Sequence, residues 1–158
     1  MNVEPRYRIG EIAEDLGVST RTLRYYEELG LLTPSAYSKG GSRRYVEADR
    51  QRILRIRELQ AIMGFNLDEI REILQADDRL AELGTEYRRG VTPKRHKAIL
   101  LEAARLNART QEQVVAKMAI LQAFQDELEA KAARYREVGK ELGIDLAAEL
   151  RSDSHSTG

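Results

Sequence analysis

A long stretch without helix-breaking residues limits how this chain can fold. Thr92-Pro93 supplies an N-cap followed by proline at the first helical position, and neither Pro nor Gly occurs again before Gly139. The stretch predicts one helix of roughly 45 residues, about 68 Å long at 1.5 Å per residue. A helix of that length cannot bury its apolar face against a domain of about 75 residues, so another surface must cover it.

Apolar residues in the second half of this helix follow a coiled-coil spacing. They alternate steps of four and three residues, which predicts a seam of about three heptads. The predicted dimerisation residues are Val114, Met118, Leu121, Leu128 and Tyr135. A second copy of the same chain is the simplest source of a partner helix.

Two short amphipathic segments lie near the N-terminus. Residues 8–16 place apolar side chains at helical spacing, and a Gly-Val turn leads to Ser19, a favourable N-cap for a helix from Thr20 to about Leu29. Two short helices joined by a tight turn of three or four residues are typical of a helix-turn-helix. Taken alone, this unit also fits any pair of short packed helices.

The next segment predicts a β-hairpin beside these helices. Residues 38–42, SKGGS, have the composition of a hairpin tip, and residues 43–46 that of a short strand. Such a wing would carry basic side chains towards a phosphate backbone: Lys39, Arg43 and Arg44.

A third helix is predicted from about residue 47 to residue 63, where Gly64 ends it. Its predicted buried side chains share one face: Ile53, Ile56, Leu59 and Ile62. Residues 19–57 include nine basic and four acidic side chains, whereas residues 58–91 include eight acidic and four basic ones. This segregation predicts a basic footprint for phosphates, although the formal net charge of the chain is +0.

The remaining segments complete a mainly α organisation. A fourth helix is predicted from Leu67, behind a capping box of Asn66 and Glu69, and the weakly periodic segment that contains Gly84 predicts a separate helical connector. The predicted parts are a winged helix-turn-helix domain (1–75), the connector (76–91), a long coiled-coil dimerisation helix (92–142) and a short, partly disordered C-terminal tail (143–158).

Three blocks of the chain, in this order, closely resemble the MerR family of bacterial transcription regulators: RIGEIAEDLGVSTRTLRYYEELGLLTP, GSRRY and MGFNLDEIREIL. The resemblance spans about residues 7–75. It implies a winged helix-turn-helix domain followed by a dimerisation helix that pairs as an antiparallel coiled coil in a homodimer. It further implies binding to a pseudo-palindromic promoter in double-stranded DNA, where bending and untwisting of the spacer alters its use by RNA polymerase.

The resemblance also implies roles for single residues. Those matching the start of the family's recognition helix are candidates for contacts at or near base edges: Thr20, Arg21 and Thr22. Those matching backbone contacts are Arg24, Tyr25, Tyr26 and the wing residue Arg43. Tyr26 suits either the backbone or the core. The full predicted DNA-binding set is Ser19, Thr20, Arg21, Thr22, Arg24, Tyr25, Tyr26, Lys39, Arg43 and Arg44. The segment before Gly64 is one residue longer than the commonest family pattern.

Composition restricts what the regulator could sense. With no cysteine, the thiol-based metal and redox sensing found in many family members is excluded. His96 and His155 are too far apart in sequence to predict a metal site, and no cofactor is predicted. A small organic effector would bind between residues 77–90 and the long helix of the partner chain. Two alternatives are that these side chains simply pack together, and that the regulator has no effector.

Other functional classes fit the sequence less well. An enzyme is not predicted, because paired acids such as Glu27-Glu28 lack a nearby His, Cys or glycine-rich phosphate loop. An excisionase-like DNA-bending protein shares the winged domain, but a long coiled coil favours fixed operator spacing and promoter control. No apolar run approaches a membrane span and no signal peptide is evident, so we expect a cytoplasmic protein without a membrane partner.

Overall fold

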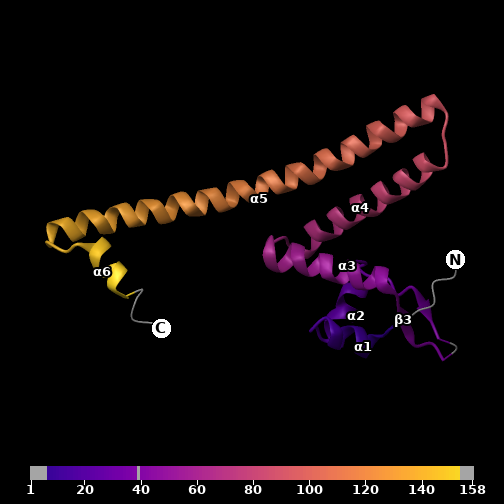
Figure 1. Cartoon of the computed structure of the whole chain (residues 1–158), viewed down its shortest axis with the longest axis horizontal. Coiled ribbons are helices and arrows are strands. Elements are labelled where there is room, and N and C mark those ends of the chain that lie inside the picture. Colours follow the sequence, from indigo (N-terminus) through magenta and orange to yellow (C-terminus); the bar gives the residue numbers. More distant parts are fainter. Residues whose placement is uncertain (1–6, 39, 154–158) are drawn as a thin grey trace. The chain divides into compact units, whose positions relative to one another are not determined.

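The computed structural model describes residues 7–38 and 40–153 of the chain. The fold is mainly α, and the predicted winged helix-turn-helix followed by a long helix is confirmed (Figure 1). The chain divides into two compact units, Met1–Gln111 and Glu112–Gly158. No helix in the described ranges has both the length and the apolar character that crossing a membrane requires.

The first two helices form the predicted helix-turn-helix. Helix α1 (Ile9–Asp15) ends in a tight turn at Gly17, whose φ of 62° lies in the left-handed region that favours glycine. Helix α2 (Thr20–Glu28) then begins at its N-cap Ser19, whose hydroxyl accepts a hydrogen bond from the Thr22 backbone N–H at 2.9 Å. This bond satisfies one of the free donors of the first turn, so the helix starts at the predicted residue.

The wing is a three-stranded antiparallel sheet with β3 in the middle. Strand β3 (Arg43–Tyr45) pairs with β2 (Ala36–Tyr37) to make the hairpin and with β1 (Tyr7–Arg8) on its other side. The Ser38 N–H donates to the Ser42 carbonyl at 2.8 Å across the hairpin tip. Pairing with β1 attaches the wing to the chain immediately before α1.

The third helix differs from the sequence prediction in its last turn. Helix α3 (Glu47–Arg57) passes into a π-helical turn, η1 (Glu58–Ile62), closed by a bond from the Met63 N–H to the Glu58 carbonyl. A π turn holds one residue more than an α turn, which agrees with the extra residue that the family resemblance implies before Gly64. It also changes the face on which the following side chains lie. Ile62, predicted to be buried, is instead 79% exposed.

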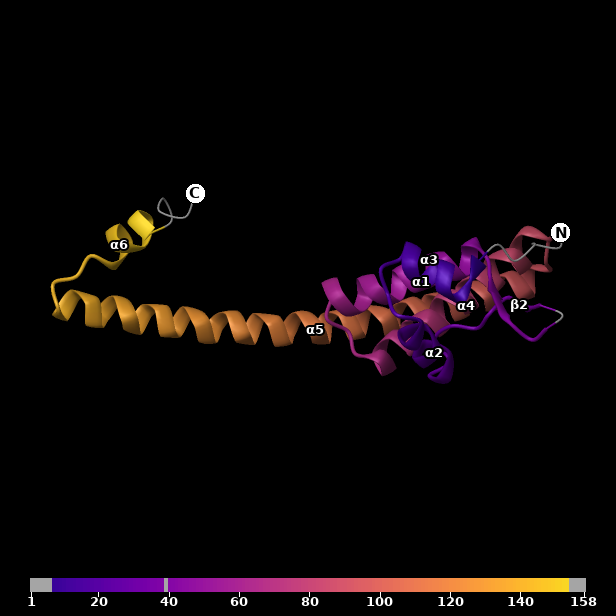
Figure 2. The same ribbon diagram turned by 90° about the horizontal axis from the view of Figure 1, so that it is seen from below.

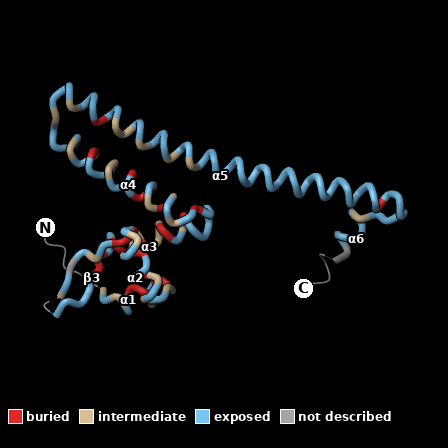
Figure 3. Tube along the Cα trace, turned by 180° about the vertical axis from the view of Figure 1, so that it is seen from behind, coloured by how far each residue is buried: buried red, intermediate tan, exposed pale blue. Residues whose placement is uncertain are grey.

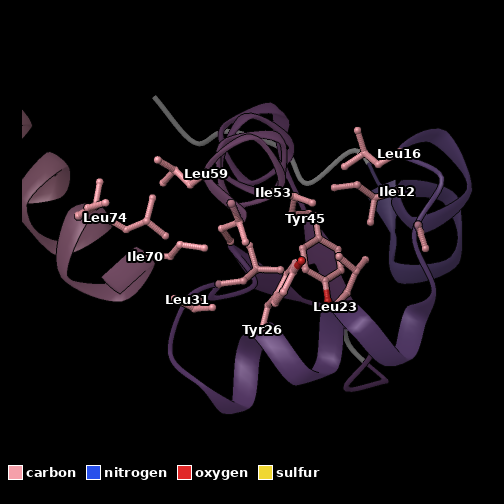
Figure 4. Packing of buried hydrophobic residues seen from close by; sticks show 14 of the residues in the cluster. Ile12, Leu16, Leu23, Tyr26, Leu31, Tyr45, Ile53, Leu59, Ile70 and Leu74 are labelled. Atoms are coloured by element: carbon pink, nitrogen blue, oxygen red, sulfur yellow. The ribbon is translucent and has the colours of Figure 1, made fainter. Parts of the chain in front are cut away.

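The helix-turn-helix, the wing, α3 and the next helix close around one core (Figure 4). Leu23 from α2, Tyr45 from β3 and Ile53 from α3 have no exposed surface at all. Figure 4 shows their side chains converging, with Ile70 and Leu74 packed from the following helix. The core therefore fixes α2 and the wing relative to each other.

Helix α4 (Leu67–Arg88) corrects the prediction of a separate connector, because it runs without a break through Gly84. Its predicted capping box is confirmed by Asn66 and Glu69, each of which accepts a bond from the other's backbone N–H. The continuous helix allows α4 to pair along its length with the start of the following helix, α5 (Pro93–Glu141), as Figures 1 and 2 both show.

Two ion pairs hold α4 against the start of α5. Arg79 contacts Glu102 at 2.6 Å, and Arg95 contacts Glu86 through two nitrogens at 2.5 and 2.6 Å. These contacts hold the pKa of both glutamates below the usual value, chiefly through the hydrogen bonds from the arginines. The two helices thus form a hairpin within the N-terminal unit.

The second unit consists of the rest of α5 and a short helix, α6 (Leu146–Asp153). Figure 3 shows this part of α5 as almost wholly exposed, and Gly139 is the one buried residue between 112 and 151. Within the tail predicted over residues 143–158, Leu146–Asp153 form helix α6. The prediction of disorder beyond that point lies outside the described residues.

Candidate nucleic-acid interface

The exposed side of α2 gathers the polar side chains predicted to face DNA. Arg21, Arg24 and Tyr25 are exposed, and together with Thr20 and Thr22 they line an open hollow of about 670 Å³. Within the described part of the chain, neither arginine has an ion-pair or hydrogen-bond partner. Two unpaired guanidinium groups beside a phenol provide donors that a phosphate or a base edge can accept.

The first turn of α2 is ordered by its cap. The hydroxyls of Ser19 and Thr22 lie 2.8 Å apart, in addition to the bond between the Ser19 hydroxyl and the Thr22 backbone N–H. The free N–H groups at the N-terminus of a helix also favour an approaching anion. Ser19 therefore fixes the residue at which α2 starts.

A second, basic hollow lies between the wing and α1. It measures about 930 Å³, and its arginine lining comprises Arg8, Arg24, Arg43 and Arg44. Arg24 lines this hollow and the one on α2, so the two form one surface across helix and wing. A basic groove of this kind suits a nucleic-acid backbone, although Glu11 and Glu14 also line the second hollow.

Glu27 links α2 to the wing. One of its carboxylate oxygens contacts Arg43 Nε at 2.6 Å, and the other accepts a hydrogen bond from the Tyr45 hydroxyl. Tyr45 is fully buried, and burial is the largest cause raising the pKa of its phenol, followed by the bond to Glu27. The phenol therefore stays protonated and keeps donating to the carboxylate.

The structure places Tyr26 in the core. It is 4% exposed, and its hydroxyl donates to Gln60 at 3.3 Å. Burial raises the pKa of this phenol, with an opposing effect from Arg57. Of the two roles that the sequence left open for Tyr26, packing is the one that its surroundings support.

The arginines of α3 contribute less to the basic surface than their number suggested. Arg50 pairs with Asp15 at 2.8 Å, and Arg55 pairs with Glu58 at 2.7 Å. Arg52 donates to the Leu31 carbonyl at 2.5 Å and also pairs with Asp78. Arg57 donates to the Leu16 carbonyl. These four side chains hold neighbouring helices and turns together.

The structure places the predicted DNA-binding residues in different environments. Those that the structure brings together on one surface are Ser19, Thr20, Arg21, Thr22, Arg24, Tyr25, Arg43 and Arg44. Lys39 lies outside the described residues. Sequence reasoning missed Arg8, which joins the surface because β1 pairs with β3. It also missed Glu27 as a link, because the spacing between residues 27 and 43 carries no periodic signal.

The segment considered for an effector shows packing contacts. Leu83 and Ile99 are buried, whereas Leu100 and Leu101 are exposed. The rings of Tyr87 and His96 lie with centroids 4.8 Å apart. Among the described residues there is no cluster of three or more His, Asp or Glu side chains arranged to hold a metal ion.

The winged domain matches a known protein family. Residues 7–77 match the family described as "MerR HTH family regulatory protein". Over 80 residues the chain is 42% identical to the nodulation protein NolA of Bradyrhizobium elkanii, which covers 49% of this chain and 35% of NolA. The chain therefore spans about a third of the length of this relative.

Two further similarities extend beyond the winged domain. The chain is 28% identical over 123 residues to the HTH-type transcriptional regulator YfmP of Bacillus subtilis, covering 77% of this chain and 87% of YfmP. It also resembles the crystal structure of HiNmlR, a MerR family regulator lacking the sensor domain, bound to promoter DNA. That similarity has a TM-score of 0.50 and 28% identity, and it covers 87% of this chain and 95% of HiNmlR.

Proposed function

We propose, from the premise that this chain belongs to the MerR family of helix-turn-helix regulatory proteins, that it regulates transcription as a homodimer bound to a pseudo-palindromic promoter. The observation that carries the proposal is the continuous surface on α2 and the wing, where the side chains of Arg21 and Arg24 are exposed and have no partner among the described residues. The promoter complex of HiNmlR supports DNA as the ligand of that surface. The site of action is then the bacterial cytoplasm.

The dimer rests on the exposed seam of α5. Its side chains are 41% to 64% exposed in the single chain: Val114, Met118, Leu121, Leu128 and Tyr135. A stripe of this length at coiled-coil spacing is stable when a second helix covers it. An antiparallel pairing of two copies would present two winged domains, one to each half of the pseudo-palindrome.

Promoter control follows from how such a dimer would hold DNA. Thr20, Arg21 and Thr22 read base edges, while Arg24, Tyr25 and Arg43 grip the phosphate backbone. Contacts on both sides of the promoter spacer favour a bent and untwisted duplex. Part of the binding free energy therefore deforms the DNA, and RNA polymerase recognises the deformed promoter. Regulation by the dimer depends either on binding of a small organic effector or on the amount of protein alone.

Footprinting on the promoter of its own gene, combined with run-off transcription, tests this function. We expect protection of a pseudo-palindrome and a change in transcript level when the protein is added. A protected promoter with unchanged transcription would contradict the regulatory role. No preference for any duplex from a randomised library would contradict sequence-specific binding itself.

The division of labour on α2 predicts two distinct mutant phenotypes. Arg24→Ala should weaken binding to selected and random duplexes alike. It should also reduce the slope of log K against log salt by about one per bound half-site. Arg21→Ala should instead cost about 1–3 kcal/mol on the selected duplex and change the sequence preference. Equal losses on selected and random DNA for Arg21→Ala would remove Arg21 from base reading.

A further inference from the structure

We propose that Glu27, an acid on the helix that faces DNA, is a positioning residue that aims the wing arginine Arg43 at the phosphate backbone. The inference rests on the proposed function, because it gives Arg43 a DNA phosphate as its second partner. Glu27 is negatively charged and is itself repelled by DNA phosphates, yet in this role it strengthens DNA binding.

Glu27 is enclosed between the core and the wing. Its side chain is 11% exposed, whereas that of Arg43 is 41% exposed. The Tyr45 hydroxyl binds Oε1 of the carboxylate, and Arg43 Nε lies 2.6 Å from Oε2. Because Tyr45 has no exposed surface, the first bond fixes the carboxylate from inside the core.

The strand geometry makes this arrangement directional. Arg43 and Tyr45 are two residues apart on β3, so their side chains lie on the same face of the sheet. Glu27 spans both side chains from α2. The path runs from a buried phenol, through the carboxylate, to a guanidinium on the strand residue next to the hairpin tip.

Arg43 keeps enough donors for a phosphate. A guanidinium carries five N–H groups, and a single carboxylate oxygen occupies only part of that fork. The exposed remainder of the side chain lines the basic hollow together with Arg8 and Arg44. A flexible arginine loses rotamer freedom when it binds a phosphate, and fixing it in advance reduces that cost.

A purely structural role for Glu27 would need only an acceptor for the Tyr45 hydroxyl. A negative charge is costly here, because the residue is largely enclosed and lies towards the C-terminal end of α2, where the helix dipole opposes it. Glutamine would accept the same bond without that cost. The advantage of the carboxylate over glutamine is its ion pair with Arg43.

Glu27→Gln therefore separates the two roles, and Glu28→Gln is the matched control. The control removes the same charge from the neighbouring residue, which is exposed and lines the hollow on α2 but does not pair with Arg43. The full chain is titrated with a duplex that the wild type selects from a randomised library, at several salt concentrations. Thermal unfolding of each variant is recorded in parallel.

We expect Glu27→Gln to weaken binding about tenfold and to reduce the slope of log K against log salt by about two, one for each wing of the dimer. Arg43→Ala should give the same reduction, and the double variant should lose little more than Arg43→Ala alone. Glu28→Gln removes an acid from the hollow on α2 without disturbing Arg43, so it should neither weaken binding nor reduce the slope. Equal or tighter binding by Glu27→Gln with an unchanged slope would overturn the inference.

Tyr45→Phe decides the matter if Glu27→Gln does not fold. It keeps both charges and removes only the bond that fixes the carboxylate, so we expect binding to weaken severalfold and the slope to fall. Wild-type binding by a folded Tyr45→Phe protein would then overturn the inference. If the wild type selects no duplex, the proposed function fails, whereas a DNA-binding wild type with an unaffected Glu27→Gln variant contradicts only the role of Glu27.

Discussion

Leu23 on α2 and Leu121 on α5 are both leucines on helices, yet the first is 0% exposed and the second is 60% exposed. Leu23 belongs to a core that closes within the N-terminal unit, where side chains from helices and wing meet. Leu121 belongs to a helix for which residues 112–151 supply almost no covering surface. In the first unit the preference of leucine for burial is satisfied within one chain. In the second unit it is not satisfied within the chain, and the proposed dimer would satisfy it.

The largest expected effect tests the second unit. Leu121→Asp places a carboxylate on the proposed seam twice per dimer, and burying charges without partners costs several kcal/mol. We expect the dimer dissociation constant to rise by at least about 100-fold, measured by sedimentation equilibrium. Val115→Asp is the control, because Val115 is also exposed but lies off the seam. Unchanged dimerisation of Leu121→Asp would contradict the seam.

A somewhat smaller effect tests the first unit. Leu23→Ala should leave a cavity in the closed core and lower the free energy of unfolding by about 3 kcal/mol in a urea titration. Leu142→Ala, which truncates a side chain that is 68% exposed, should change it by less than about 0.5 kcal/mol at low protein concentration. Similar losses for both variants would mean that burial in the single chain does not distinguish the two units.

The smallest effect concerns the ion pairs between α4 and α5. Because Arg95 lowers the pKa of Glu86, this pair contributes stability above the usual glutamate pKa and loses it as pH falls through the lowered value. Glu86→Gln should lower the melting temperature by a few degrees at most at pH 7, and the difference should disappear towards pH 3. Glu141→Gln, in the second unit, should show no difference at either pH. A deficit for Glu86→Gln that persists in acid would rule out the charge as its cause.

Local signals in the sequence predicted much of this fold. The cap at Ser19, the capping box at Asn66 and the uninterrupted stretch after Pro93 each marked a helix start that the structure confirms. Such signals act between residues a few positions apart, so they can be recognised without knowing the tertiary structure. The roles of Arg21 and Arg24 on α2 came instead from the family resemblance, and the exposure of both side chains agrees with it.

The interactions that sequence reasoning missed join residues far apart in the chain. Arg52 was counted as part of a phosphate footprint, but its partners are the Leu31 carbonyl and Asp78. Gly84 suggested a break in the helix, yet α4 continues through it beside α5. A glycine in a helix costs only about 1 kcal/mol, which tertiary packing readily offsets. The composition of a segment shows which charges exist, whereas the fold decides which of them remain available.

The π turn at residues 58–62 has a consequence for how such a chain diverges from its relatives. A residue inserted in a regular α-helix rotates everything beyond it by about 100°, which would move Phe65 out of the core. Here the wider turn holds one additional residue, and Leu59 within the turn and Phe65 beyond it are both buried. Gain or loss of one residue at this point can therefore pass as a neutral step in evolution. Alignments of related sequences should place their gap inside a helix here, where gaps are ordinarily penalised.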